Sequence, residues 1–368
     1  MDEVKKQSSR ENGLDLLRLI AAFGVVMAHV LTPYIKYYDG LSDNGGYRLD
    51  TLSFVTILLR MQNWAVTVFF MISGAFVLRS AKTADFKSFY HKTWKKLGIP
   101  TIVFSVIFMI ITPVYRVISG SMPDIVTSYL YELLGTFKGM PAEHMWYMFV
   151  LIGMYLMAPF IVLGREKVGS QVFAKMSVIV FIWGTIGCLL EKPSYYWTLG
   201  TIINLLGIFM MGCAIHEKIG EKKDRSKGIL FIILGILAAL LIAFIFVFGN
   251  YMKVIPGFIA DILGKLTPYN PLVSLGGGCM FAGFRLLDIK KDFFNLAEIT
   301  FYVYLVHPLV MMAVSLIESK ALGIPYSVFG KPESIAVIVI NTVIVYILSF
   351  VVGKLIISFK GKKAKAGA

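Results

Sequence analysis

Three ionisable residues lie in one apolar stretch near the start of the chain, "GLDLLRLIAAFGVVMAHV", residues 13 to 30. They are Asp15, Arg18 and His29, and each is costly in hydrocarbon unless it is paired, hydrated or used for chemistry. Arg18 and His29 are eleven residues apart, which on an α-helix places them within about 20° of the same face, with a rise of roughly 16 Å between them. One helix face therefore presents a guanidinium that can hold an anion and an imidazole that can act as a base or a nucleophile.

Asp15 lies one turn before Arg18, where it can pair with the guanidinium and is favoured by the helix dipole. Two simpler interpretations stay open at this point. Arg18 can reach the headgroups as an anchor at the inner surface, and His29 can be a hydrogen-bonded packing residue. Their occurrence together on one face favours a functional pair.

A second polar stripe is predicted in "RMQNWAVTVFFMISGAF", where Arg60, Asn63, Thr67 and Gly74 fall within roughly 60° of one another on a helix. Small and hydroxylated residues such as Thr67, Ser73 and Gly74 also mediate close contacts between membrane helices. That alternative does not account for Arg60.

Two further histidines stand in apolar segments. In "EHMWYMFVLIGMYLMAPF", His144 is the distinctive member, because an aromatic belt at the outer interface explains Trp146 and Tyr147 equally well.

In "EITFYVYLVHPLVM", the residues Thr300, Tyr304 and His307 share a helix face, and Pro308 should loosen the backbone beside the histidine. We expect these polar segments to face one another or a wet cavity.

The elements that must position these residues are membrane-spanning helices. The chain is 57% hydrophobic and 16% charged, and its mean hydropathy is +0.74. Apolar runs long enough to cross a bilayer recur along it, which predicts an all-α polytopic membrane protein of about ten spans. The expected spans are Leu14–Ile35, Leu52–Leu78, Leu97–Ile118, Met145–Leu163, Val172–Leu190, Leu199–Ile215, Ile229–Phe248, Leu266–Phe284, Leu296–Leu316 and Ile335–Phe359.

The positions of Lys and Arg predict the orientation. Most of the 36 basic residues fall in segments that lie on one side if the N-terminus is cytoplasmic, so both termini are expected inside. The predicted organisation is a cytoplasmic tail at residues 1–12, a membrane domain at 13–359 and a basic cytoplasmic tail at 360–368. The longest connections, including Ser119–His144, are expected on the outer side.

Several functions are disfavoured by the sequence. The net charge of +14 is spread over the cytoplasmic segments instead of one basic domain, so no nucleic-acid partner is expected. Cys188, Cys213 and Cys279 lie far apart in apolar runs, which indicates packing residues. The motifs "HExxH" and "GxSxG" and Walker-type loops do not occur. We expect no metal and no tightly bound cofactor.

Four motifs in this order and spacing resemble the acyltransferase 3 family of integral membrane acyltransferases. They are "LDLLRLIAAFGVVMAH", "NWAVTVFFMISGAF", "HMWYMFVLIGMYLMAPF" and "YVYLVHPLVM". The likeness extends from about residue 12 to residue 355, and its most specific element is the Arg followed by ten residues and a His, here Arg18 and His29. Members of this family are mostly bacterial enzymes that O-acetylate envelope glycans.

The resemblance implies roles for individual residues. His29 would be the catalytic residue, and Arg18 would contact the acyl-CoA. Lys95 and Lys96, in "HKTWKKLGIP", would lie near the CoA phosphates. Where many relatives have an Arg ten residues before the serine of "SG", this chain has Asn63, and Arg60 is the expected substitute one turn earlier.

The residue that orients His29 stays open. Some relatives have an acid two turns after the histidine, where this chain has Lys36. Asp39, Glu143 or a backbone carbonyl are the alternatives.

The resulting hypothesis is an O-acyltransferase of the bacterial cytoplasmic (inner) membrane. Acetyl-CoA, the donor substrate, would enter from the cytoplasm, and the group would pass to a hydroxyl of an envelope or lipid-linked glycan on the outer side. His29 would serve as general base or as acyl carrier. Channel polar groups or oxyanion donors would come from Asn63, Ser73, Tyr304 and His307. The acceptor sugar would meet His144, Trp146 and Tyr147.

Two other classes remain open from the sequence. A transporter or flippase for a small polar or polyprenyl-linked substrate needs polar residues along a continuous pathway but no base on a donor channel. A non-catalytic subunit of an envelope complex would tolerate the loss of His29. The acceptor, the acyl chain and the oligomeric state are not readable from the residues.

Overall fold

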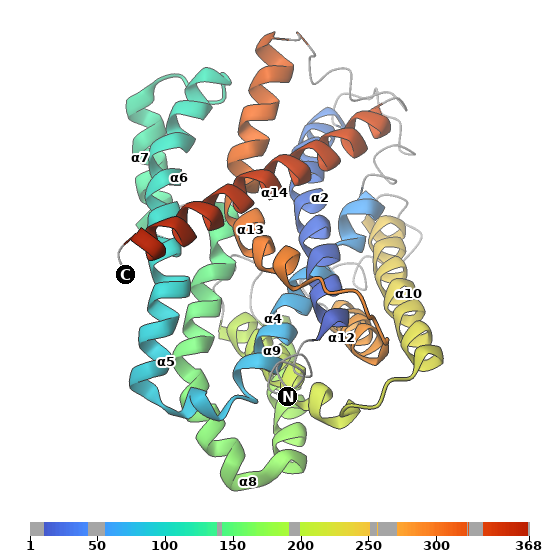
Figure 1. Cartoon of the computed structure of the whole chain (residues 1–368). Coiled ribbons are helices and arrows are strands. Elements are labelled where there is room, and N and C mark those ends of the chain that lie inside the picture. Colours follow the sequence, from blue (N-terminus) through green and yellow to red (C-terminus); the bar gives the residue numbers. More distant parts are fainter. Residues whose placement is uncertain are drawn as a thin grey trace.

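The structure is a computed structural model, and part of the chain is described in it. The described backbone covers residues 11–42, 56–137, 142–190, 199–250, 256, 271–321, 323 and 334–366. These residues form a bundle of long, oblique helices (Figure 1). The main helices are α2 (Asn12–Ser42), α4 (Trp64–Val77), α5 (Phe86–Thr93), α6 (Ile99–Ile118), α7 (Ile125–Phe137), α8 (Trp146–Leu190), α9 (Leu199–Ile219), α10 (Arg225–Asn250), α12 (Pro271–Leu286), α13 (Phe294–Leu316) and α14 (Ser334–Ala366).

The predicted all-α membrane fold is confirmed. The described residues contain no strand, and eight of their helices are long and apolar enough to cross a membrane. A shorter apolar helix lies at Leu272–Leu286. Two predicted spans fall within α8, which is interrupted at Gly169 (φ 79°, ψ 163°), a backbone conformation that glycine adopts readily. The total of about ten spans, the cytoplasmic termini and the two tails stay predictions.

Several boundaries differ from the sequence prediction. The third span begins at Phe86 instead of Leu97, because α5 continues into α6 through a π-helical turn at Trp94–Gly98. The segment Ser119–His144, expected as a plain connection, contains α7, which packs against α6. The apolar pattern located α6 but missed the helical residues before it, in α5 and the π-helical turn, and the separate helix α7.

The second predicted span also departs from a regular helix. Gln62 and Asn63 form a turn before α4, with backbone bonds from Gln62 to Leu59 and from Asn63 to Arg60. These bonds join residues three apart, so the turn is tighter than an α-helix and rotates α4 relative to the residues before the turn. The expected stripe is therefore divided: Thr67 packs against Gly277 of α12, and Gly74 packs against α9.

Helix α4 lies at the centre of the bundle, in contact with α2, α8, α9 and α12. Its side chains Phe70 and Met71 are fully buried. One glycine on each helix, Gly74 in α4 and Gly212 in α9, lets the two helices approach closely. A Cβ on Gly74 would lie 1.7 Å from the carbonyl oxygen of Phe209, and a Cβ on Gly212 would lie 2.0 Å from that of Met71. Such backbone contacts supply packing where lipid offers no hydrophobic contrast.

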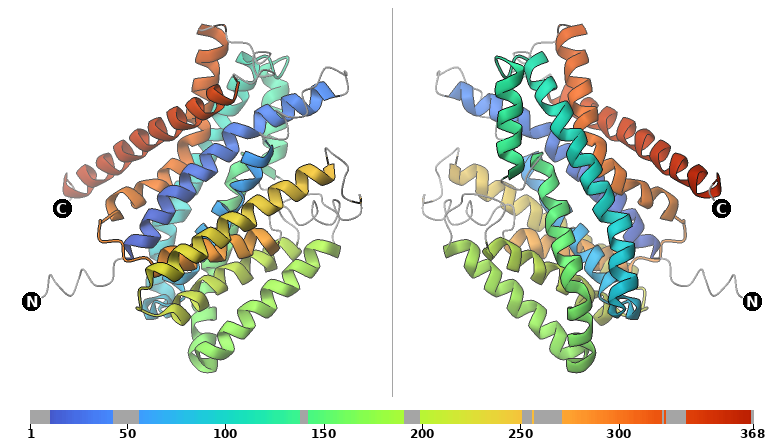
Figure 2. Two further views of the ribbon diagram at one scale, coloured as in Figure 1. Left: turned by 90° about the vertical axis from the view of Figure 1, so that its right-hand side faces the viewer. Right: turned by 90° about the vertical axis from the view of Figure 1, so that its left-hand side faces the viewer.

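Helices α2 and α13 lie side by side and run in the same direction (Figure 2). Near their starts Arg18 and Glu298 line one cavity, and further along the His29 and His307 rings stack. The two helices are predicted as the first and ninth spans. Odd-numbered spans cross the membrane in the same direction, so the parallel arrangement agrees with this prediction. In the left view of Figure 2, α2 begins and α14 ends on the left side of the bundle.

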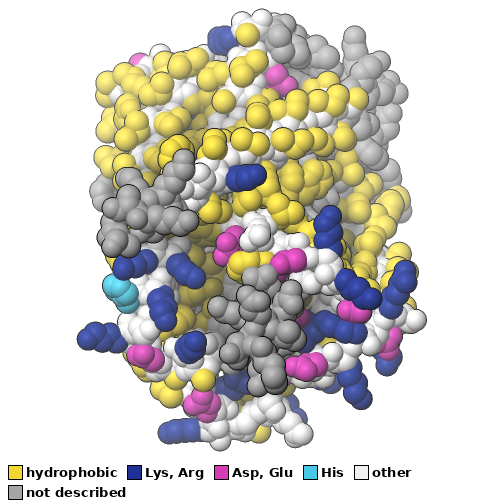
Figure 3. All heavy atoms as spheres, viewed as in Figure 1, with side chains coloured by type: hydrophobic (Ala, Val, Ile, Leu, Met, Phe, Trp, Pro, Cys, Tyr) yellow, Lys and Arg dark blue, Asp and Glu magenta, His cyan; other side chains and the backbone are white. Residues whose placement is uncertain are grey.

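An ion network joins several helix ends near the start of α2. His216 of α9 places Nε2 3.0 Å from Glu11 Oε1 and 3.1 Å from both Arg79 Nη1 and Arg285 Nε. Arg285 Nε also lies 3.1 Å from Glu11 Oε2. On the face shown in Figure 3, charged side chains gather over the lower part, and the upper part is largely hydrophobic. This distribution agrees with a polar inner surface beneath the membrane core.

A matched pair of glycine variants tests the α4–α9 contact. We expect Gly74→Ala to lower the midpoint of thermal unfolding in detergent, since the new methyl overlaps a backbone carbonyl, and overpacking costs about 1–3 kcal/mol. The control is Gly153→Ala in α8, where a Cβ has no heavy atom within 4 Å. Equal midpoints for the two variants would contradict the close contact.

The network also predicts a dependence on pH. Burial alone raises the pKa of the Glu11 carboxyl, but the hydrogen bond to His216 and the charge of Arg285 outweigh it, so the pKa lies below its ordinary value of 4.5. The stability gained from ionised Glu11 is thus present above about pH 4.5 and is lost as the pH falls through the lowered pKa. Glu11→Gln should unfold at a lower temperature than the parent at pH 7, and the difference should shrink below pH 4. A difference independent of pH would contradict this account.

Candidate functional site

Three histidines from distant parts of the chain lie close together. The His29 ring of α2 stacks on the His307 ring of α13, with centroids 4.9 Å apart and an interplanar angle of 28°. The His144 ring lies 6.2 Å from that of His29 and 5.5 Å from that of His307. His144 and His307 are buried, and His29 is half-buried. The structure therefore brings together one histidine from each of three predicted polar segments.

Tyr304 closes the cluster on one side. Its hydroxyl donates a hydrogen bond to the backbone carbonyl of His144, and its ring lies 5.7 Å from the His144 ring and 6.0 Å from the His307 ring. The bond fixes the short 3₁₀ turn Glu143–Met145 against α13. The position of His144 thus depends on Tyr304.

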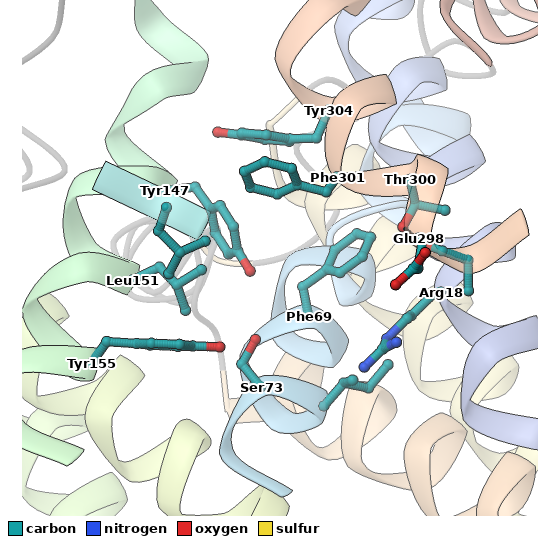
Figure 4. Close-up of a pocket in the computed structure, with 13 residues that line it drawn as sticks. Arg18, Phe69, Ser73, Tyr147, Leu151, Tyr155, Glu298, Thr300, Phe301 and Tyr304 are labelled. Atoms are coloured by element: carbon teal, nitrogen blue, oxygen red, sulfur yellow. Dashed lines mark hydrogen bonds between the residues drawn. The ribbon is translucent and has the colours of Figure 1, made fainter. Parts of the chain in front are cut away.

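A cavity of about 220 Å³ lies on the other side of Tyr304, and we refer to it as the membrane cavity (Figure 4). Arg18 and Glu298 line one side of it, and Tyr147 and Tyr155 line the other. The complete lining is Arg18, Phe69, Ile72, Ser73, Leu97, Tyr147, Leu151, Tyr155, Ala297, Glu298, Thr300, Phe301 and Tyr304.

Arg18 is stabilised at membrane depth by several partners. Its Nη1 lies 3.0 Å from Oδ1 of the buried Asp15, as the spacing predicted. The guanidinium lies 5.0 Å from the centroid of the Phe76 ring, and Glu298 lies near it on the same side of the cavity. A guanidinium has five N–H donors, so these contacts leave donors for a ligand.

The opposite wall presents three hydroxyl groups. Ser73 lies beside Tyr147 and Tyr155, and Figure 4 shows both phenol oxygens directed toward it. This wall can donate and accept hydrogen bonds within an otherwise apolar cavity.

A second cavity, of about 360 Å³, is referred to as the basic cavity. It lies beside α5 and the π-helical turn, and it presents Lys82, Lys92 and Lys96. Leu97 and Tyr155 line both cavities, so the two adjoin there. The full lining is Phe76, Val77, Ser80, Lys82, Thr83, Phe89, Lys92, Thr93, Lys96, Leu97 and Tyr155.

Some predicted residues lie elsewhere. Lys95 is exposed and lines neither cavity, unlike its neighbour Lys96. Arg60 lies 3.8 Å from the Phe246 ring of α10 and likewise lines neither cavity. The Asn63 side chain has a buried Nδ2 without a hydrogen-bond partner among the described residues.

The predicted acceptor-side residues are divided. Trp146 is buried in the core and not at an open interface, and Tyr147 lines the membrane cavity together with Arg18. The side chains of Asp39 and Glu143, alternatives for orienting His29, lie outside the described residues. Within the described part of the chain, no group of three His, Cys, Asp or Glu side chains has a metal-binding arrangement.

Sequence reasoning missed Tyr155, Glu298, Lys82 and Lys92. Tyr155 falls on the cavity face two turns after Tyr147, so helical spacing alone would have added it. Glu298 is exposed at the start of α13 and reads as an ordinary surface acid. Nothing in the local sequence pairs it with Arg18, because that contact depends on the packing of α2 against α13.

Nearly the whole chain matches one protein family. Residues 11–358 match the model of the family Acyl_transf_3, described as an acyltransferase domain. The chain belongs to the acyltransferase 3 family. The resemblance seen in the sequence is thereby confirmed, and the protein is a multi-pass membrane acyltransferase. No curated protein and no solved structure matches the chain.

The bond from Tyr304 to His144 can be tested with Tyr304→Phe, which keeps the ring and removes the donor. Loss of a partner for a buried carbonyl costs about 1–3 kcal/mol, so the midpoint of thermal unfolding should fall. Tyr131→Phe is the control, because Tyr131 is exposed and its ring contact with Arg116 is retained. If Tyr304→Phe unfolds at the parent's temperature, this bond does not hold the site together.

Proposed function

We propose that this acyltransferase uses an acyl-CoA, with acetyl-CoA as the expected donor, and transfers the acyl group to a hydroxyl of an envelope or lipid-linked glycan. The donor binds from the cytoplasmic side of the bacterial inner membrane, and the acceptor binds on the outer side. Support comes from the chemistry of successive parts of the site, taken from the basic cavity toward the histidines.

The basic cavity suits the nucleotide end of the donor. CoA carries several phosphate charges, and charge-assisted hydrogen bonds from Lys82, Lys92 and Lys96 would hold them. The same residues fall in a segment predicted to lie on the cytoplasmic side, and CoA is made in the cytoplasm. Lys96 was already expected from the sequence to lie near the CoA phosphates, and the basic cavity adds Lys82 and Lys92.

The membrane cavity suits the pantetheine arm. That arm is apolar apart from two amides and a hydroxyl, and the cavity is apolar apart from Arg18, Glu298 and the hydroxyl groups of Ser73, Tyr147, Tyr155, Thr300 and Tyr304. Amide groups that leave water need such partners. Arg18 would contact the arm through donors that Asp15 does not use.

The histidine cluster suits the transfer step. His29 would act as general base toward the acceptor hydroxyl or would carry the acyl group itself. A thioester oxyanion needs a donor nearby, and the unpartnered Asn63 Nδ2 and the hydroxyl of Ser73 are the available groups named by the sequence. Tyr304 can join them only after its bond to the His144 carbonyl opens.

A single observation carries the proposal. The basic cavity and the membrane cavity share Leu97 and Tyr155, and the membrane cavity is also lined by Tyr304, whose ring lies beside those of His144 and His307. A route lined first by cations, then by hydroxyls and finally by imidazoles follows the order of phosphate, amide and thioester in an acyl-CoA.

Release of free CoA thiol by the purified protein in nanodiscs, supplied with acetyl-CoA and envelope glycans as acceptors, tests the donor. His29→Ala should abolish release. Arg18→Ala and Lys96→Ala should raise KM by about tenfold, because one charge-assisted contact is worth about 1.5–3 kcal/mol.

Lys227→Ala is the matched control for Lys96→Ala. Lys227 is an exposed cation paired with Asp224 and lines neither cavity, so KM should not change. An equal rise in KM for both lysine variants would reflect net charge and not a phosphate site. Release that is absent from the parent, or unchanged by His29→Ala, would favour the transporter instead.

A further inference from the structure

The proline after His307 changes the hydrogen bonding of α13. Pro308 has no backbone N–H, so the carbonyl of Tyr304, four residues earlier, lacks its helical donor. His307 fills this place: its Nδ1 lies 2.7 Å from the Tyr304 carbonyl oxygen and 3.2 Å from that of Val303. Carbonyl oxygens only accept hydrogen bonds, so Nδ1 must carry a proton.

The other ring nitrogen of His307 is then left as an acceptor. A neutral imidazole with a proton on Nδ1 presents a lone pair at Nε2. The His307 side chain is fully buried, and its Nε2 has no hydrogen-bond partner among the described residues. The rings beside it in the described part of the chain are those of His29, His144 and Tyr304, none of which supplies a negative charge that would favour a second proton.

A buried nitrogen without a hydrogen-bond partner lowers stability, and a second such nitrogen lies close by. The Nε2 of His144 is also buried and unpartnered within the described part of the chain. Both rings neighbour His29. Two unsatisfied nitrogens beside the same imidazole indicate a place where a polar substrate group completes the hydrogen bonding.

We infer that His307 is a second catalytic histidine, whose Nε2 takes the proton of the acceptor hydroxyl while His29 carries the acyl group. The inference rests on the proposed function. In the first step His29 attacks the thioester carbon, the C–S bond breaks, and the ring proton of His29 leaves with the thiolate as CoA thiol. In the second step the acceptor oxygen bonds to the acyl carbon, its proton moves to His307 Nε2, and the C–N bond breaks. The imidazolate of His29 then recovers that proton from His307.

Pro308 is the positioning residue in this arrangement. Its missing N–H frees the carbonyl that holds the Nδ1 proton, and this keeps the lone pair at Nε2. In Pro308→Ala the new N–H competes for the Tyr304 carbonyl, so both tautomers of His307 become accessible.

The first test reads the tautomer without reference to activity. Nitrogen-15 NMR of the protein labelled at its five histidines reports which ring nitrogens are protonated, and the His307 signals are assigned by their loss in His307→Gln. We expect the parent to show a protonated Nδ1 and a bare Nε2, and Pro308→Ala to show a mixture. A protonated Nε2 in the parent would overturn the inference.

The second test separates the two steps. Inverted membrane vesicles of the native host, which carry the acceptor, are given radiolabelled acetyl-CoA. His307→Gln, whose amide cannot take up a proton, should retain label on the His29 peptide and lower label in the glycan fraction at least 100-fold. Pro308→Ala should lower transfer about tenfold and still acylate His29.

The outcomes are distinguishable. Transfer within twofold of the parent in His307→Gln, or loss of transfer with no label trapped on His29, would overturn the role of His307 alone. No label in any fraction of the parent would instead overturn the proposed function. Thermal unfolding midpoints of both variants confirm that the chain is folded when it is assayed.

Discussion

The site depends on one packing arrangement, in which α2 and α13 lie side by side and run in the same direction. Arg18 faces Glu298 at one level, and His29 stacks on His307 about two to three turns further along. With the opposite direction the cation would meet the histidine level of α13 and lose its acid. A buried charge is tolerated only with such partners, so the pairing of α2 with α13 is also a condition for Arg18 to stay at membrane depth.

Close packing elsewhere makes room for the cavities. Gly74 and Gly212 bring α4 and α9 into backbone contact, so neither helix interposes side chains at that level. Ser73, the neighbour of Gly74, is turned instead toward Tyr147 and Tyr155 and lines the membrane cavity. The "SG" pair thus has two functions: the glycine permits contact on one face of α4, and the serine supplies a hydroxyl on another.

The sequence predicted the fold class and the three histidines because burial of ionisable groups in apolar helices is visible locally. His29, His144 and His307 each stand out within one segment, and membrane thermodynamics implies that they meet. The tighter turn at Gln62–Asn63 was not predictable, since no proline or glycine marks it, and it divided the expected stripe of Arg60, Thr67 and Gly74. Glu298 became part of the site only through the contact between α2 and α13, which are distant in sequence.

Tyr304 lines the membrane cavity and also lies beside the His144 and His307 rings, and its bond to the His144 carbonyl holds the ring in this position. If the donor and the acceptor bind on opposite sides of the membrane, as proposed, this arrangement would be useful, because a continuous wet channel would leak ions and expose a bound thioester to water. An acyl-CoA arm that fills the membrane cavity would have to displace the ring, which would release the His144 carbonyl and free the phenol hydroxyl. The same movement that admits the thioester to His29 would thereby supply an oxyanion donor, so access and transition-state stabilisation would be coupled through one side chain.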